Sequence, residues 1–305
     1  MNPLLSIKNL NVSYGKTQVV SNASLKILEK ETIGLIGKSG SSKTTIALSI
    51  MGLLPEDATA TGEIIYKEKN LLTLKEKEIN KIRGCEIAMI FQDPVSVLDP
   101  LFSIKEQIKE TITAHLDISK KEVEKRIEDL LKKVGIQKIR LNEYPHSFSG
   151  GMAQRIMIAQ AISSNPKLLI ADEPTSSLDV TIQSQIMNLL HSLKSELEIS
   201  ILLITHDLSI IAQMADYVYV IYSGEIIESA SCLEIFDNPS HPYTKALIDS
   251  IPKKGKDLSF IEDTQILEDK PCRFYSRCKE KISLCEKEKP EIKKIENHYV
   301  RCHKY

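Results

Sequence analysis

The periodicity of apolar and polar positions changes along the chain, and each change predicts a different kind of element. Residues 5–27 alternate between apolar and polar side chains, which is typical of antiparallel strands. The runs 167–171 and 200–204 are apolar throughout, as strands of a parallel sheet covered on both faces must be. Further strands are expected at 32–36, 62–66 and 87–91, and a hairpin over 217–228. Together these patterns predict an α/β protein with a separate antiparallel portion.

A helical pattern dominates from about Pro100 to Asn165. Its clearest stretch has one apolar face opposite a charged face, and Gly135 provides a natural stop. The apolar face consists of Val123, Ile127, Leu130, Leu131 and Val134. The charged run 75–83 predicts another helix with a solvated face. We therefore expect a helical insertion between the strands.

Length and composition narrow the class of protein. The 305 residues, 42% of them hydrophobic, suffice for two domains or for one large α/β domain with additions. No apolar run approaches the roughly 20 residues that span a bilayer, and the N-terminus lacks a signal-sequence pattern. The formal net charge of −1 gives no indication of nucleic-acid binding. We expect a cytoplasmic protein whose membrane role, if it has one, depends on a partner.

A phosphate-binding loop is predicted between the strand at 32–36 and the helix-compatible run 45–51. The sequence Gly37-Lys38-Ser39-Gly40-Ser41-Ser42-Lys43-Thr44 places a glycine-rich turn and a Lys-Thr pair at a helix N-terminus. Backbone N–H groups there cradle phosphate, the lysine reaches the β- and γ-phosphates, and the threonine ligates Mg²⁺. One position departs from the pattern, because Ser42 stands where glycine is expected, and we expect weaker ATP binding or slower turnover. The candidate residues are Gly37, Ser39, Gly40, Ser41, Ser42, Lys43, Thr44 and Thr45.

Polar residues follow three of the apolar strands. Asp172 and Glu173 end one strand about 130 residues after the loop, and this spacing places Asp172 with Thr44 at Mg²⁺ and Glu173 as general base for the attacking water. His206 ends the next strand and can hydrogen-bond the γ-phosphate. Gln92 ends a third and can offer an amide oxygen to Mg²⁺ or to the water.

A second anion-binding turn is predicted at Ser149-Gly150-Gly151, before an amphipathic run that ends at Ile162. An ordinary capped helix would explain the serine but not the paired glycines. One nucleotide has one triphosphate, so a second phosphate-binding helix in the same chain needs a reason. A head-to-tail dimer, in which each chain's turn closes over ATP held by the other chain's loop, supplies it.

This set of motifs, in this order, resembles the ATPase subunits of ABC transporters over roughly residues 4–250. The resemblance implies a RecA-like P-loop ATPase core with an antiparallel β subdomain, a helical subdomain and a small cysteine-rich C-terminal extension. The expected boundaries are 1–240 for the ATPase domain, with the helical subdomain at about 96–162, and 241–305 for the extension. It further implies that Tyr14 stacks on adenine and that Ser177-Leu178-Asp179 couples the two sites of the dimer.

Longer strings resemble one branch, the peptide/nickel ABC importers. They are Phe91-Gln92-Asp93-Pro94, Tyr144-Pro145-His146 and His241-Pro242-Tyr243-Thr244-Lys245-Ala246-Leu247. The resemblance implies an ATPase at the cytoplasmic face of the membrane that powers import of di- or oligopeptides. Its partners would be a homologous ATPase subunit, giving a heterodimer, two integral-membrane permeases and, indirectly, an extracellular binding protein, with no nucleic acid.

Three alternatives to peptide import stay open from the sequence. The same branch also contains importers of nickel or metal chelates. A degenerate-site regulatory subunit is the second alternative, although the lysine, threonine, carboxylates and histidine are all intact. A soluble ABC ATPase acting on nucleic acid or ribosomes is the third, and this chain has neither the tandem cassettes nor the basic patch expected of it.

Four cysteines crowd the last 34 residues, whereas Cys85 and Cys232 stand alone. The four are Cys272, Cys278, Cys285 and Cys302, with five, six and sixteen residues between them. This spacing lacks the close pairs of most structural zinc sites, whereas a [4Fe–4S] cluster needs four thiolates without one fixed spacing. The family resemblance implies such a cluster, with Zn²⁺ as the alternative and free thiols as a third reading. Either metal would staple a segment too small for its own core.

Overall fold

The computed structural model describes residues 2–176, 178–251 and 270–305, and they form two compact units. Unit 1 combines Met1–Leu72 with Leu203–Tyr305, and unit 2 is Thr73–Leu202. The boundary at Leu202 falls inside strand β8, which spans Ser200–Thr205. Ser177, expected to help couple the sites of a dimer, lies outside the described residues.

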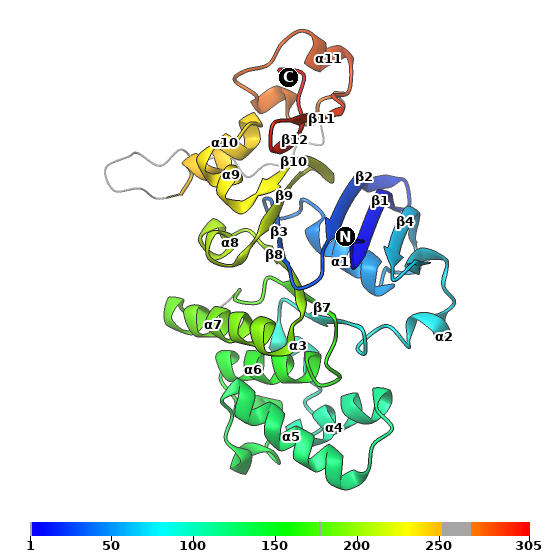
Figure 1. Ribbon diagram of the computed structural model, residues 1–305, viewed down its shortest axis with the longest axis vertical. Helices are drawn as coiled ribbons and strands as arrows, with labels where there is room; N and C mark the ends of the chain where they lie inside the picture. Colours follow the sequence, from blue (N-terminus) through cyan, green and yellow to red (C-terminus); the bar gives the residue numbers. More distant parts are fainter. Residues whose placement is uncertain (1, 177, 252–269) are drawn as a thin grey trace. The chain divides into compact units, whose positions relative to one another are not determined.

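An antiparallel sheet occupies the N-terminal part of unit 1, as the alternating pattern predicts. Its strand order is β2-β1-β4-β5, and β1 pairs antiparallel with both β2 and β4 (Figure 1). Alternate apolar side chains such as Leu10 and Val12 are fully buried, which directs one face of β1 into the core, although the register with β2 shifts between these two residues. The four strands are β1 (Leu5–Tyr14), β2 (Thr17–Ile27), β4 (Ala58–Tyr66) and β5 (Lys69–Asn70).

The other strands of unit 1 run in the order β11-β12-β10-β9-β3. Strand β3 pairs parallel with β9, and β9 and β10 form the predicted hairpin. Ser223 and Gly224 at its turn both have positive φ, 45° and 80°, as a tight hairpin turn requires. The strands are β3 (Thr32–Ile36), β9 (Tyr217–Tyr222), β10 (Glu225–Ser231), β11 (Ile292–Ile295) and β12 (His298–Arg301).

The C-terminal segment is built onto this sheet. Strand β12 pairs with β10, with Glu228 opposite Val300. Glu228 is fully buried and accepts hydrogen bonds from the backbone N–H groups of Ser240 and His241, while His298 Nδ1 lies 3.0 Å from its Oε1. The helices of unit 1 are α1 (Lys43–Met51), α8 (Leu208–Met214), α9 (Cys232–Asp237), α10 (Pro242–Asp249) and α11 (Leu284–Lys287). One buried carboxylate thus ties together β10, the start of α10 and β12.

Unit 2 contains two parallel strands and most of the helices. Strand β6 (Ile87–Ile90) pairs parallel with β7 (Leu168–Asp172). Its helices are α2 (Glu76–Ile79), α3 (Pro94–Val97), α4 (Ile104–His115), α5 (Lys120–Val134), α6 (Gly150–Ala161) and α7 (Val180–Leu197). The helix expected over 75–83 is therefore too long, because only Glu76–Ile79 is α-helical. Ile79 is the one residue of α2 that is buried, so a longer helix would lack an apolar face to pack.

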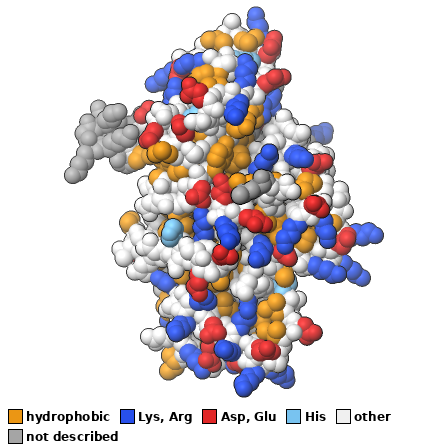
Figure 2. Space-filling view, in the orientation of Figure 1, with side chains coloured by type: hydrophobic (Ala, Val, Ile, Leu, Met, Phe, Trp, Pro, Cys, Tyr) orange, Lys and Arg blue, Asp and Glu red, His pale blue; other side chains and the backbone are white. Residues whose placement is uncertain are grey.

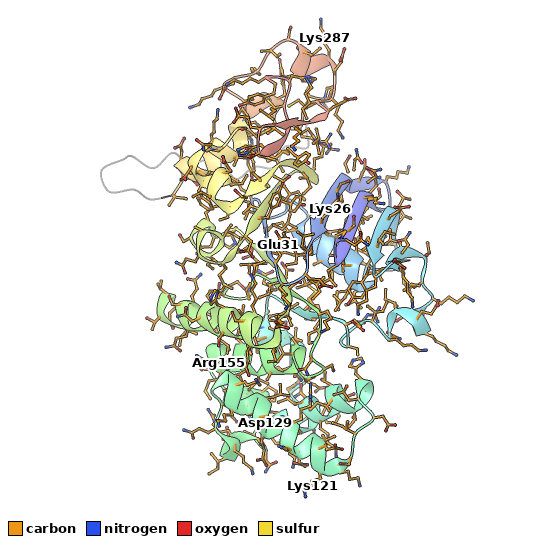
Figure 3. All side chains as sticks on the ribbon, viewed as in Figure 1. Lys26, Glu31, Lys121, Asp129, Arg155 and Lys287 are labelled. Carbon is orange, nitrogen blue, oxygen red and sulfur yellow. The ribbon has the colours of Figure 1, made fainter. Side chains whose placement is uncertain are left out.

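Helix α5 confirms the predicted apolar face and stop. Its five apolar residues are all buried, and Gly135 ends the helix with φ of 73°. A capping box between Ser119 and Glu122 fixes its start. Arg155 of α6, labelled in Figure 3, donates to the carbonyl of Val134 and to Gln185 Oε1, both at 2.9 Å. This arginine links the end of α5 to α6 and α7.

The surface shows no dominant charge on the face drawn in Figure 2, where Lys and Arg side chains are interspersed with Asp and Glu. Within the parts of the chain that the structure describes, no helix combines the length and apolar character needed to cross a bilayer.

Candidate functional site

The predicted phosphate-binding loop has its expected context, because β3 leads into residues 37–42 and α1 begins at Lys43. The loop closes through a hydrogen bond from the N–H of Ser41 to the carbonyl of Lys38, at 3.1 Å. Gly40 has φ of 75°. Lys43 is buried, and its Nζ donates to the carbonyls of Gly37 at 2.7 Å and Lys38 at 3.1 Å. The ammonium group therefore lies inside the curve of the loop.

Ser42 occupies a left-handed backbone conformation, with φ of 74° and ψ of 24°. Glycine is the residue that reaches this region without strain, which explains why the loop pattern prefers it at this position. The serine side chain compensates in part, because its Oγ donates to the carbonyl of Val19 at 2.7 Å. The position at which the sequence departs from the pattern therefore requires a positive φ, and the serine that occupies it is held by its hydrogen bond to Val19 of β2.

Two features of the loop fit a bound phosphate. A Cβ at Gly37 would lie 2.3 Å from the carbonyl oxygen of Ile221, so the backbone at this point tolerates no side chain. The Oγ of Ser41 is buried and makes no hydrogen bond to any residue in the described part of the chain. A buried hydroxyl is costly to leave without a partner, and a phosphate oxygen would supply one. Thr44 is exposed and Thr45 half-buried in the first turn of α1.

Two other candidates lie in unit 1. Tyr14 is half-buried at the end of β1, where it pairs with Thr17 of β2 and Ala58 of β4. His206 is exposed directly after β8. Asp207, which follows it, caps α8 by accepting from the N–H groups of Ser209 and Ile210. The cap fixes where β8 ends and α8 begins, and so where the histidine leaves the strand.

The other acidic and amide candidates meet in unit 2, at one edge of the β6–β7 pair. Ile90 lies opposite Ala171 in the parallel register, so Gln92, which follows β6, and Asp172, which ends β7, lie at the same end of the two strands. A hydrogen bond of 3.0 Å from Ser176 Oγ to the carbonyl of Gln92 joins the two loops. The structure therefore brings together the strand ends of β6 and β7, as expected for strands that run parallel.

Asp172 and Glu173 differ in their surroundings. Asp172 is 2% exposed, whereas Glu173 is half-buried in the loop that follows. Glu173 has φ of 46°, a left-handed conformation that costs a non-glycine residue about 1–3 kcal/mol and is concentrated at functional sites. Its carbonyl accepts from the N–H of Ser176 at 3.1 Å, which closes the turn that holds this conformation.

The serine–glycine turn lies at the N-terminus of α6. Ser149 and Gly150 are exposed, and the Ser149 side chain makes no capping bond to the described first turn of that helix. A Cβ at Gly151 would lie 2.6 Å from Ile182 Cγ2 of α7, whereas one at Gly150 would meet only an ordinary contact of 3.5 Å. The second glycine thus permits close helix packing, and the first leaves the helix start open.

Asp179 has a structural contact of its own. It caps α7 by accepting from the N–H of Ile182 at 3.0 Å. The candidate residues therefore divide into two sets: Tyr14, the loop and His206 in unit 1, and Gln92, the serine–glycine turn, the carboxylates and Asp179 in unit 2.

The sequence did not predict one contact to the loop. The N–H of Lys38 donates to the phenolic oxygen of Tyr243 at 3.1 Å. Tyr243 belongs to the string 241–247, which the sequence singles out only by family resemblance. Nothing in periodicity or spacing relates residues so far apart in the chain.

All six cysteines are free thiols, and four of them are neighbours in the C-terminal segment. Cys278, Cys285 and Cys302 lie near enough to Cys272 to add to the rise in the pKa of its thiol, and the N–H of Cys272 donates to the carbonyl of Cys285 at 3.3 Å. Burial raises the pKa of Cys272 to about 11, and it also raises the pKa values of Cys278 and Cys302. Among residues 2–176, 178–251 and 270–305, however, no set of three or more Cys, His, Asp or Glu side chains is arranged as metal ligands.

Comparison with known proteins identifies related chains over nearly the whole length. Residues 20–176 match the family model described as ABC transporter, and residues 227–285 match that of the oligopeptide/dipeptide transporter C-terminal region. The chain is 41% identical to the dipeptide transport ATP-binding protein DppD of Bacillus subtilis, over 99% of this chain and 95% of that protein. It is 45% identical to the oligopeptide transport ATP-binding protein OppD of the same organism, over 82% and 72%.

Solved structures with a similar fold include cbiO1 from Clostridium perfringens, part of the ABC transporter complex cbiONQ. The TM-score is 0.69 at 30% identity, covering 78% of this chain and 92% of that one. An ATP-binding cassette solved as a dimer in a post-hydrolysis state, bound to ADP and Pi, has a TM-score of 0.67 at 28% identity, covering 75% and 98%.

Proposed function

This chain belongs to the ABC transporter ATPases of the oligopeptide/dipeptide branch, and we propose that it hydrolyses ATP to power the import of di- and oligopeptides. The observation that carries the proposal is the joint match of one chain to the ABC transporter family and to the oligopeptide/dipeptide C-terminal region. Curated relatives that it matches over nearly its full length are named as dipeptide or peptide import ATP-binding proteins. The nickel alternative has no such relative among these.

Uptake measurements test the substrate class. In cells that lack this subunit, uptake of labelled di- and tripeptides should fall and return when the gene is restored, with nickel uptake unchanged. Loss of nickel uptake with intact peptide uptake would overturn the peptide proposal. Purified protein should hydrolyse ATP in either case.

ATP phosphates would bind in the loop at residues 37–45, with Lys43 reaching them and Tyr14 stacking on adenine. The buried Ser41 hydroxyl and the close approach at Gly37 support this role. Mg²⁺, when bound, would neutralise charge on the phosphates, and Thr44, Gln92 and Asp172 are the residues that would hold it.

Glu173 would act as general base for the attacking water, and His206 would hydrogen-bond the γ-phosphate. The left-handed conformation of Glu173 supports this assignment. Glu173→Gln should lower kcat by about 10²–10⁴-fold while ATP binding is retained. Glu198→Gln is a matched control, because Glu198 also has positive φ, 52°, at the end of α7. Undiminished turnover in Glu173→Gln would exclude Glu173 as the base.

Two such subunits, this chain and a homologous partner, would sandwich two ATP molecules. The turn Ser149-Gly150-Gly151 of each would close over the nucleotide of the other, with Asp179 in the coupling segment. The exposure of Ser149 and Gly150 supports this, and a relative of the same fold was solved as a dimer. Ser149→Arg should abolish ATP-dependent dimerisation in light scattering and leave ATP binding by the separate chain unchanged. Dimers that persist in this variant would exclude the turn from the interface.

Closure and opening of the dimer would drive two integral-membrane permeases, which would hold this subunit at the cytoplasmic face of the membrane. An extracellular binding protein would deliver the substrate. Affinity purification from solubilised membranes should recover permeases. Recovery of ribosomes or DNA would favour the soluble-ATPase alternative instead.

The four C-terminal cysteines would hold a [4Fe–4S] cluster, with Zn²⁺ as the alternative. Their mutual proximity and their chemistry support the proposal, although the thiols would have to converge further to become ligands. Anaerobic purification, a visible spectrum and metal analysis distinguish the two metals. A colourless protein with stoichiometric zinc would exclude iron, and a metal-free protein would exclude both.

A further inference from the structure

The peptide group between Gly37 and Lys38 is held from both sides. Its carbonyl accepts from Lys43 Nζ at 2.7 Å, and its N–H donates to the hydroxyl of Tyr243 at 3.1 Å. The backbone at Gly37 also lies against the carbonyl of Ile221, where no Cβ would fit. The start of the phosphate-binding loop is therefore clamped between β9 and a side chain of α10.

The surroundings of Tyr243 fix the hydroxyl that accepts from the N–H of Lys38. It is fully buried, and its ring lies 4.6 Å from that of Tyr222 and 5.5 Å from that of Phe274, centroid to centroid. Its own N–H donates to His241 Nδ1 at 3.0 Å, which caps α10. Aromatic neighbours on two sides and a capped helix leave the hydroxyl little freedom to follow the loop if the loop moves.

We propose that Tyr243 is a positioning residue for the phosphate-binding loop. A phosphate would compete with the carbonyls of Gly37 and Lys38 for the N–H groups of Lys43 Nζ, and this would weaken one of the two restraints on the peptide group. The Tyr243 hydroxyl keeps the other restraint in place, so the loop retains its conformation when nucleotide enters. This inference rests on the proposed ATP-binding function of the loop.

Phe274 extends the same packing into the C-terminal segment. It is 5% exposed, lies two residues after Cys272, and packs its ring against both Tyr222 and Tyr243. The C-terminal segment therefore reaches the loop through one ring and one hydroxyl, and a change in its packing is transmitted to nucleotide affinity.

Tyr243→Phe tests the proposal, because it removes the hydroxyl and keeps the ring. The Kd for ATP should rise about three- to tenfold, the range of one hydrogen bond, with a smaller change in kcat. Tyr219→Phe is the matched control. Tyr219 is also a buried tyrosine of unit 1, and its hydroxyl accepts from the backbone N–H of Lys26 at 3.0 Å. Lys26 (labelled in Figure 3) lies in β2 and not in the phosphate-binding loop. The Tyr219→Phe variant should lose similar stability without a change in Kd.

Three outcomes would contradict these proposals, and they distinguish the role of Tyr243 from the function on which it rests. Wild-type protein that fails to bind ATP would overturn the proposed function. Wild-type protein that binds ATP with the same Kd as Tyr243→Phe would overturn the role of Tyr243 alone. An equal rise in Kd for Tyr219→Phe would also overturn it, since the effect would then be general destabilisation.

Two further measurements do not depend on turnover. Hydrogen exchange of the Lys38 amide should be faster in Tyr243→Phe without nucleotide, and unchanged exchange would contradict the proposed restraint. Phe274→Leu should raise the Kd for ATP by a smaller factor, and this effect should vanish in the Tyr243→Phe background. Simple additivity of the two substitutions would show that Phe274 does not act through the hydroxyl.

Discussion

Replacing Ser42 by alanine and by glycine separates two effects that the structure assigns to this residue. A left-handed residue with a Cβ costs roughly 1–2 kcal/mol, and Ser42 has φ of 74°. The bond from its Oγ to the carbonyl of Val19 returns about 0.5–1.5 kcal/mol. Alanine keeps the cost and loses the bond, so Ser42→Ala should reduce the free energy of unfolding by about 1 kcal/mol.

Glycine should behave differently at the same position. It removes the left-handed cost, loses the bond to Val19, and adds about 0.5–1 kcal/mol of chain entropy in the unfolded state. These contributions nearly cancel, so Ser42→Gly should match the wild type in stability. ATP affinity should also stay within about twofold, because serine already has the backbone conformation that glycine would adopt.

Urea unfolding and ATP titration of the three proteins check this reasoning. The expected order of stability places wild type and Ser42→Gly together and Ser42→Ala below them. If Ser42→Ala is as stable as the wild type and Ser42→Gly, the energies given for the left-handed conformation and for the bond to Val19 are both wrong. If Ser42→Gly binds ATP many times more tightly, the serine does weaken the loop, as the sequence alone leads one to expect.

Two further predictions concern stability. Gly151→Ala should lower the free energy of unfolding by about 1–3 kcal/mol, because the added Cβ would lie 2.6 Å from Ile182 Cγ2. Gly150→Ala is the control, and it should leave the stability unchanged or stabilise α6. Equal unfolding midpoints for the two variants would contradict the close contact between α6 and α7. Burial lowers the pKa of His241 to about 3; a backbone hydrogen bond with Arg301 and the charge of Glu280 oppose this shift in part, and the charge of Lys245 adds to it. The contribution of the neutral imidazole to stability is therefore complete above pH 6.5 and is lost as the pH falls toward 3. Between pH 7 and pH 5 the free energy of unfolding of the wild type should fall by about 2 kcal/mol. The variant His241→Asn, which can still cap α10, should not show this fall.

The elements that the sequence predicts correctly are those with local causes. The strand–turn–helix at 32–51 follows from an apolar run, glycines and a helix-compatible run. Helix α5 follows from five apolar residues on one face and Gly135 at its end. The hairpin of β9 and β10 follows from two apolar runs around Ser223 and Gly224. In each case the residues that determine the element lie within it.

Conformations and contacts that depend on residues far away in the chain could not be predicted from the sequence. The φ of 74° at Ser42 depends on the whole loop, and its tether is Val19 on another strand. A charge-rich pattern suggested a helix over 75–83, but only Glu76–Ile79 is helical, because a single buried residue cannot anchor a longer one. The sequence predicts an anion-binding role for the backbone N–H groups at Gly151, and the structure adds a packing reason for the glycine, because a Cβ there would lie 2.6 Å from Ile182 Cγ2 of α7.

The C-terminal segment shows most clearly how non-local contacts change the interpretation. The sequence predicts a small cysteine-rich extension that has too little core of its own and that a metal would staple. The structure instead gives it a share of the core of unit 1, with Phe274 at 5% exposure and Val300 fully buried. Strand β12 adds to β10, and Glu228 binds the start of α10. Because the hydroxyl of Tyr243 in that helix accepts from the N–H of Lys38, the packing of the C-terminal segment continues through the core of unit 1 to the predicted phosphate-binding loop.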